Sequence, residues 1–319
     1  MEHTKNNAAK FAFFYMLSLV ALIFMALSSG MIIFQIINKF IIDVINTERF
    51  SDDALKFAIS AIIVSTPIYY FTMRQIGKNL LSGELKEESG IRKWLTYFIL
   101  LVSSVVMIGW FIATINSFFN GELTTKFILK AVTAIGIAAL IFSFYLYDIK
   151  RSGVAGKKDK VINIYTYLTL VAVIVIFIAS LFIVESPTAT RNRKQDEKVL
   201  SQFSQIDSAI QEYLMINDKL PNNFDELIDE VEYLSQGDIK NPNTGNIFDY
   251  KILSENRYEL CDTFLTSNKG EDGPGDLTYI PYKELWPHEA GYQCIDRTIK
   301  NNNKEMINRV PGEEPVIIR

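Results

Sequence analysis

The residue types that most often carry chemistry are scarce in this chain. It contains two histidines, His3 and His288, and two cysteines, Cys261 and Cys294. A zinc site made of four thiolates is therefore excluded, as are most sites that need several imidazoles. A nucleophile activated by histidine would have to use His288, which stands alone in the polar part of the chain beside Trp286 and is more simply interpreted as a structural residue. We expect no catalytic site and no bound cofactor.

One acidic segment offers a candidate site for a metal ion. Glu271, Asp272 and Asp276 are interspersed with glycines, which permit tight turns. Carboxylate oxygens are the ligands that calcium prefers, but the spacing does not follow the EF-hand pattern. Two interpretations therefore stand: a calcium site formed by these three carboxylates, or an acidic turn exposed to solvent.

The composition divides the chain into two dissimilar parts. Of the 319 residues, 49% are hydrophobic and 21% are charged. Residues 1–185 contain long apolar runs and 17 Lys or Arg against 12 Asp or Glu, whereas residues 186–319 contain 15 against 24. Long apolar runs are typical of membrane proteins. We therefore expect a membrane part followed by a polar domain, which excludes a single soluble enzyme domain.

Five apolar stretches are long enough to cross a bilayer, which takes roughly 20 residues. They cover residues 11–37, 57–73, 94–119, 127–147 and 161–184. We expect a four-helix transmembrane domain over residues 1–160 and a fifth transmembrane helix over residues 161–185. The first stretch could instead be a signal peptide cut after Ser28, but its apolar run continues beyond the length that a signal core needs.

The positively charged residues around these stretches indicate an orientation. Twelve Lys or Arg fall in the N-terminal segment and the second and fourth connections, against five near the first and third. The rule that cytoplasmic loops are the more basic ones predicts a cytoplasmic N-terminus, and five spans then place the C-terminal domain outside the cytoplasm. We expect a multi-pass protein of the bacterial plasma (inner) membrane. The basic residues 191–198 fit contact with anionic lipid headgroups or solvent better than contact with nucleic acid.

This orientation also predicts the state of the cysteines. Cys261 and Cys294 both lie in the domain that we place in an oxidising compartment. Disulfides persist in such compartments, so we expect these two residues to be bonded. Two buried thiols are the alternative, and the absence of a CxxC spacing argues against a redox-active pair.

The apolar stretches carry no ionisable residue near their centres, where pumps and transporters usually place one. Lys130 lies near the end of a stretch, from which its amine could extend to the interface. We therefore expect a packed anchoring bundle in the lipid bilayer, with a transporter or channel as the less favoured alternative.

Three segments of the membrane part carry a resemblance. They are Gly-Ile-Arg-Lys-Trp-Leu-Thr-Tyr at residues 90–97, Gly-Glu-Leu-Thr at 121–124 and Tyr-Leu-Tyr-Asp-Ile-Lys-Arg at 145–151. Together they make residues 8–151 similar to an uncharacterised bacterial family of four-helix integral-membrane domains, a domain of unknown function. This resemblance implies an architecture and no chemistry.

The polar domain, residues 186–300, begins with the signals of a long helix. Ser186-Pro187 suits a helix start, and Asp218 with Pro221 suits its end. Between them, one apolar stripe has helical spacing and predicts about 25 helical residues. The stripe consists of Val199, Phe203, Ile206, Ile210 and Tyr213.

The rest of this domain has the pattern of a short helix and a small sheet. Asn223 and Glu226 have the spacing of a capping box. Residues 248–253 and 258–264 are short aromatic-rich runs that predict a β-hairpin, and residues 291–299 predict a third strand. The polar residues 301–319 are expected to form a flexible tail.

The order of these elements resembles that of type IV pilins and of the pseudopilins of type II secretion. The resemblance covers residues 161–300 and is carried by Asp-Ser-Ala-Ile-Gln-Glu-Tyr-Leu at 207–214, the helix exit at 217–221, and Asn241-Pro242 with Thr244-Gly245 before the hairpin. It implies a pilin-like α+β domain. Some pseudopilins bind calcium in a nearby loop. Residues 161–184 lack the cleavage site and early Glu of pilins, which favours a permanently tethered domain.

These patterns predict an integral membrane α-helical bundle of five helices followed by an extracytoplasmic α+β domain. We expect the domain to present its exposed sheet and the helix face over residues 197–211 to an envelope protein or to another copy of the chain, without catalysis. The alternatives are a sensor that binds a ligand or calcium and, less favoured, a transporter or channel.

Overall fold

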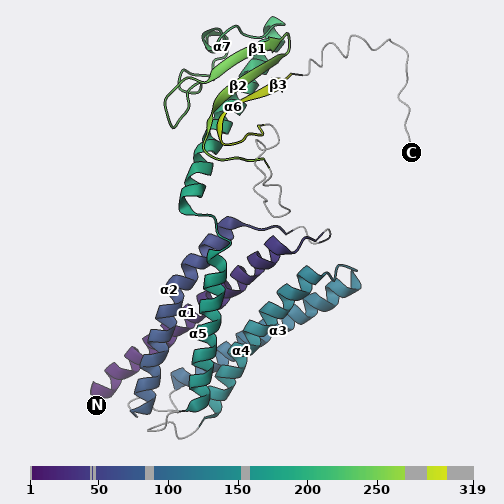
Figure 1. Cartoon of the computed structure of the whole chain (residues 1–319). Helices are drawn as coiled ribbons and strands as arrows, with labels where there is room; N and C mark the ends of the chain where they lie inside the picture. The colour runs from purple at the N-terminus through teal and green to yellow at the C-terminus, as the bar shows by residue number, and fades with distance from the viewer. Residues whose placement is uncertain are drawn as a thin grey trace. The chain divides into compact units, whose positions relative to one another are not determined.

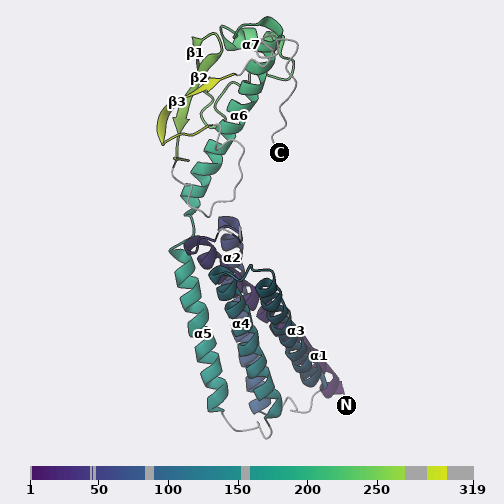
Figure 2. The ribbon, with the colours of Figure 1, turned by 90° about the vertical axis from the view of Figure 1, so that its right-hand side faces the viewer.

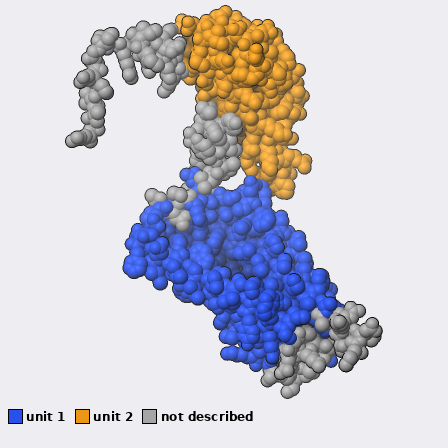
Figure 3. Space-filling view, turned by 180° about the vertical axis from the view of Figure 1, so that it is seen from behind, with its two compact units in different colours: residues 1–184, 273–278 blue, residues 185–272, 279–319 orange. Residues whose placement is uncertain are grey.

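The computed structural model describes residues 2–43, 45, 48–82, 90–151, 159–269 and 286–299. Over these residues the chain forms two compact units, divided between Val184 and Glu185. Figure 1 shows the elements and Figure 3 the two units in blue and orange. The first unit contains the five long apolar helices, and the second contains two helices and a small sheet.

The first unit consists of five helices that are long and apolar enough to cross a membrane. They are α1 (Glu2–Phe40), α2 (Asp52–Leu81), α3 (Gly90–Phe119), α4 (Thr125–Lys150) and α5 (Lys160–Leu181). The five predicted spans are thereby confirmed as helices. The first, second and fourth helices extend past the apolar runs at both ends, because backbone hydrogen bonding continues into the polar flanking residues.

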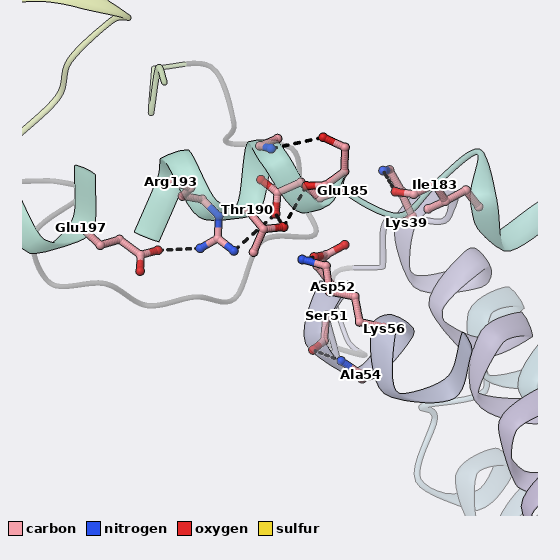
Figure 4. A network of polar contacts seen from close by, with 12 residues as sticks. Lys39, Ser51, Asp52, Ala54, Lys56, Ile183, Glu185, Thr190, Arg193 and Glu197 are labelled. Carbon is pink, nitrogen blue, oxygen red and sulfur yellow. Dashed lines mark hydrogen bonds and ion pairs between the residues drawn. The ribbon is translucent and has the colours of Figure 1, made fainter. Parts of the chain in front are cut away.

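Polar side chains cap the starts of three of these helices. Ser51 accepts a hydrogen bond from the Ala54 amide (3.2 Å), as Figure 4 shows. Thr124 accepts one from Phe127 (3.3 Å), and Asp159 accepts one from Val161 (2.8 Å). The first amides of a helix lack partners within the helix, so these caps satisfy groups that are costly to leave unbonded near a bilayer.

The first helix is central to the membrane unit. α1 contacts each of the other four helices, and α3 pairs closely with α4 (Figures 1 and 2). Ile32 of α1 and Leu55 and Ala58 of α2 are completely buried, so the closest packing is between these two helices. The outward faces remain apolar, as in Phe111 and Val171, because lipid rather than water is the solvent expected there.

Two groups of charged residues tie the helix ends together. At one end the buried Arg92 of α3 donates to the Asp148 carboxylate (3.1 Å) and backbone oxygen (2.8 Å), and Arg151 also pairs with Asp148. At the other end Lys126 and Lys130 bind Glu48. The Lys130 amine extends to Glu48, in the connection between α1 and α2, while the Lys130 side chain itself is only 4% exposed.

The second unit contains α6 (Pro187–Asn217), α7 (Phe224–Glu230), β1 (Asp249–Ser254), β2 (Arg257–Phe264) and β3 (Gly291–Thr298). The three strands form one antiparallel sheet in the order β1-β2-β3, as the sequence predicts. α6 has 31 residues rather than about 25, and its predicted start is confirmed, since Ser186 caps the Ala189 amide (3.2 Å). It ends at Asp218, whose positive φ of 53° stops the helix.

The core of this unit lies between α6 and one face of the sheet. Phe203 of α6 is at its centre, with ring centroids 5.0 Å from Phe248, 5.3 Å from Trp286 and 6.0 Å from Phe264. Leu260 of β2 is also fully buried. The predicted apolar stripe of α6 is thus confirmed, since all five of its residues are buried here.

A network of hydrogen bonds fixes the start of α7 against the end of α6. Asn223 caps the Glu226 amide (2.9 Å), and Glu226 accepts from the Asn222 amide (2.8 Å) and the Tyr213 hydroxyl (2.5 Å). The predicted capping box is confirmed in one half, the cap by Asn223, whereas the Glu226 side chain accepts from the amide of Asn222 rather than from that of Asn223. The hydrogen bond from Tyr213, together with those from Asn222, lowers the pKa of Glu226 from its ordinary 4.5 to about 2.

A pH dependence follows from this lowered pKa. Ionised Glu226 stabilises the fold above pH 4.5, and the contribution disappears as pH falls toward 2, where the folded-state carboxylate becomes protonated. Glu226→Gln should therefore unfold more easily than the parent chain near pH 7, and the difference should shrink below pH 4.5. Chemical unfolding can be followed by Trp286 fluorescence in a chain in which Phe replaces Trp94 and Trp110.

The matched control is Glu255→Gln, at an exposed position in the β1–β2 turn. It removes the same charge without touching the capping network. The lowered pKa of Glu226 would be contradicted if the difference in stability between the Glu226→Gln chain and its parent stayed constant from pH 7 to pH 2.

Candidate functional site

The face of the sheet that points away from α6 is the best candidate for a binding surface. Residues of β2 alternate between the buried core side, with Tyr258 and Leu260, and the opposite side, with Arg257 and Glu259. No described helix or strand forms a second layer over this opposite side. We call it the outer face. Figure 2 shows the sheet with α6 along one side only.

Side chains on the outer face form pairs across the strands. The Lys251 amine lies 3.1 Å from the Glu259 carboxylate, and Arg257 pairs with Asp296. The Tyr292 hydroxyl donates to Asp249 (2.6 Å), and this bond raises the pKa of Tyr292 to about 12. Exposed cross-strand pairs stabilise a sheet only modestly. Their main effect is to give the surface a fixed pattern of charge.

A disulfide joins β2 to β3 within the same face. Cys261 and Cys294 stand directly opposite each other in the register, and their sulfur atoms are bonded. The predicted pairing is confirmed. The Glu259 carboxylate lies within 4.8 Å of both sulfurs, a grouping that could suggest a metal site. Because the sulfurs are bonded to each other, neither is available as the thiolate that binds metals.

β1 forms one edge of the sheet and exposes apolar side chains there. Ile252 is 44% exposed and Leu253 is 46% exposed. The register shifts between Ile252 and Ser254, so Leu253 has no residue opposite it on β2. Such a bulge bends a strand and limits how another strand can pair with it. We call Ile252, Leu253 and the free backbone of β1 the β1 edge.

The predicted contact face of the long helix is narrower than the sequence suggests. Over residues 197–211, only Lys198, Gln205 and Ser208 are exposed. The segment after α7 lies against part of the helix, where Gln202 donates to the Gly237 carbonyl (3.4 Å). Over residues 197–211 the exposed surface of α6 is therefore a polar stripe.

The basic residues at the start of α6 are partly neutralised within the unit. Arg193 lies 2.5 Å from Glu197 and 3.4 Å from Glu185, and Thr190 donates to Glu185 (2.9 Å) (Figure 4). Arg191, Lys194 and Lys198 are exposed. The expected contact with lipid headgroups therefore depends on these three residues rather than on Arg193.

His288 and Trp286 belong to the core. The His288 ring stacks on Phe264 with centroids 4.0 Å apart, and its Nδ1 lies 3.0 Å from the Trp286 carbonyl. The Trp286 indole donates to Ser204 (2.8 Å). Both side chains are completely or almost completely buried, which supports the structural interpretation of His288.

One buried polar cluster of this unit gave no signal in the sequence. Asp207 of α6 accepts hydrogen bonds from Tyr258 and Gln211 and pairs with Arg297 of β3 (3.3 Å). Arg297 also lies over the Trp286 ring, 5.0 Å from its centroid. Burial is the main reason that the pKa of Tyr258 is raised, with the nearby Asp207 adding to it. The carboxylate is fully engaged, so its role is to join α6 to the sheet.

The three candidate calcium ligands cannot be placed. Glu271, Asp272 and Asp276 lie outside the residues that the structure describes. The expected tail, residues 301–319, also lies outside them.

Comparison with known proteins adds information on the membrane unit alone. Residues 12–146 match a family model described as a domain of unknown function (DUF5671). This match runs from α1 into α4 and confirms an uncharacterised domain in this part of the chain. Neither the curated proteins nor the solved structures contain a match to the chain.

The disulfide should contribute measurably to the stability of the second unit. It closes a loop of 33 residues, which corresponds to about 3–4 kcal/mol in the chain-entropy model. Cys261→Ala/Cys294→Ala should lower the free energy of unfolding by about this amount, measured by Trp286 fluorescence as above. Reductant should destabilise the parent chain and leave the double variant unchanged. Equal stability of the two chains without reductant would contradict a formed bond.

Proposed function

We propose that this protein anchors an extracytoplasmic, pilin-like domain in the bacterial plasma membrane, where the domain binds an envelope protein or another copy of the chain. The observation that carries this proposal is the β1 edge, where Ile252 and Leu253 are exposed at the margin of a sheet whose outer face no described helix or strand covers. The proposal includes no catalytic step.

Two observations support the extracytoplasmic placement. The N-terminal segment and two connections hold most of the Lys and Arg around the helices, which favours a cytoplasmic N-terminus. The bond between Cys261 and Cys294 is of the kind that persists outside the cytoplasm. Both observations favour a position of the second unit outside the cytoplasm.

The pilin-like interpretation is supported by the arrangement of the second unit. A long helix is capped by Ser186, ends in a left-handed residue at Asp218 and carries an antiparallel sheet on one side. Because residues 161–184 lack the processing signals of pilins, the proposed domain stays tethered to the membrane rather than leaving it during assembly.

The β1 edge offers a partner both backbone and side-chain contacts. Before the bulge at Leu253, which limits pairing there, the edge strand presents unpaired amide and carbonyl groups to which a short extended segment can add. Apolar side chains beside such an edge supply the burial that makes the contact favourable. The charged pairs of the outer face would then form a polar rim around it.

The orientation can be tested by labelling cysteines on intact cells. A membrane-impermeant maleimide should label Cys261 and Cys294 only after treatment with a reductant, without permeabilisation. As a control, Lys150→Cys in the Cys261→Ala/Cys294→Ala background should react only after permeabilisation. The opposite pattern would show that the second unit is cytoplasmic.

The role of the β1 edge can be tested with a photo-crosslinking amino acid. Placed at Leu253 in the full chain, it should form a discrete crosslinked product in cells, and Ile252→Lys should reduce the yield about tenfold, since a charge opposes burial at an interface. Lys at Ile216, an exposed apolar position at the end of α6 (59% against 44% for Ile252), is the matched control. Equal yields from the Ile252 and Ile216 variants would contradict the proposal.

A further inference from the structure

Four helices of the membrane unit surround a cleft that the proposed function does not use. α1, α2, α4 and α5 line it, and its volume is about 900 Å³. Figures 1 and 2 show α5 beside α2 and α4 within this unit. Ligand sites in proteins typically have volumes of about 300–1,000 Å³. The cleft is therefore large enough for a sizeable molecule.

The middle of the cleft is apolar. Leu22 and Met25 of α1, Phe144 of α4 and Ile176 of α5 line it. The Tyr70 hydroxyl and the Thr169 hydroxyl form a hydrogen bond (2.8 Å) that links α2 to α5 beside it. Because both hydroxyls satisfy each other, they do not oppose an apolar occupant.

Two glycines widen the cleft, one beside Lys78 near the end of α2 and one in α4. Gly77 of α2 and Gly136 of α4 both line it, and a Cβ atom added at either position would meet no other atom within 4 Å. Space therefore remains where the helices would otherwise bring side chains together. It is the kind of space that a hydrocarbon chain fills.

One end of the cleft is positively charged. Arg74 and Lys78 of α2 line it and are exposed, and no ion pair of either is found among the described residues. Arg151 lines it too, paired with Asp148 and Asp159. The charged side chains at this end are four cations and two anions, which gives a net charge of +2. They are Arg74, Lys78, Arg92, Arg151, Asp148 and Asp159.

The charged end lies on the side with the more basic connections. Arg74 and Lys78 are near the end of α2, and Arg151 follows α4, so all three border the second and fourth connections. The charge rule places these connections on the cytoplasmic side. Basic pockets between membrane helices on this side are suited to anionic lipid headgroups.

We propose that this cleft binds a glycerophospholipid with a negatively charged headgroup from the cytoplasmic leaflet. The phosphate lies at Arg74 and Lys78, and an acyl chain lies along the apolar wall past Gly77 and Gly136. Two cations that form no ion pair with any described residue lie beside an open apolar cavity. This juxtaposition selects an amphiphile over a soluble anion, which would gain nothing from the cavity.

The test compares lipids bound to the full chain in detergent. Binding is measured by native mass spectrometry with dioleoyl phosphatidylglycerol, with dioleoyl phosphatidylcholine, and with glycerol phosphate as a soluble headgroup. The anionic lipid should bind more tightly than the zwitterionic one by about 10- to 30-fold, as two nearby cations suggest. Equal binding of the two lipids, or displacement of phosphatidylglycerol by glycerol phosphate, would overturn the proposal.

Charge variants locate the headgroup. Arg74→Gln/Lys78→Gln should remove most of the preference for phosphatidylglycerol. The matched control is Lys93→Gln/Lys150→Gln, which removes two exposed cations from the same end of the bundle without altering the cleft. If both double variants lose the preference equally, the effect is one of general surface charge and the cleft is not the site.

Steric variants locate the acyl chain. Gly136→Phe should fill the cleft and weaken binding of both lipids at least tenfold. A phenylalanine in place of glycine is not expected to disfavour a helix. Gly109→Phe places the same side chain at an equally open position of α3 that does not line the cleft, and it should bind as the parent chain does. Unchanged binding by the Gly136 variant would show that the lipid sits elsewhere on the bundle.

Discussion

The structure depends on one solvent requirement: the outward faces of the first five helices are apolar and can be stable only against lipid. In α3 and α5, only 17% and 6% of the most apolar segment is buried within the protein. Water around these faces would expose a large apolar surface, whereas in a bilayer each backbone group finds its partner within its own helix. The membrane therefore completes the fold of this unit.

The same requirement explains where the charged residues of the bundle lie. Arg92, Lys126 and Lys130 are buried, yet each is tied to an oxygen near a helix end, through Asp148 or Glu48. A buried charge without such a partner is strongly destabilising. Arg74 and Lys78 are exposed instead and form no ion pair within the described part of the chain, and this difference sets the candidate lipid cleft apart from the paired networks.

Features with a local cause could be predicted from the sequence, and those that depend on distant contacts could not. The five helices, the hairpin, the end of α6 at Asp218 and the cysteine pair each have a signal in a short segment or in composition. Asp207 meets Tyr258 and Arg297 across 51 and 90 residues, and Lys130 meets Glu48 across 82. No periodicity encodes such contacts, and the cleft likewise arises only from how four helices pack.

The core of the second unit also holds the chain that leaves β2 beside the chain that enters β3. The Asn268 side chain donates to the Trp286 carbonyl (3.0 Å), and the Asn268 backbone amide donates to the His288 carbonyl (3.1 Å). These hydrogen bonds lie beyond the last pair of the two strands, Phe264 with Gly291, so they continue the connection between β2 and β3 past the sheet. The alignment of the two strands therefore has a support besides the bond between Cys261 and Cys294, and a reducing environment would not by itself free one strand from the other.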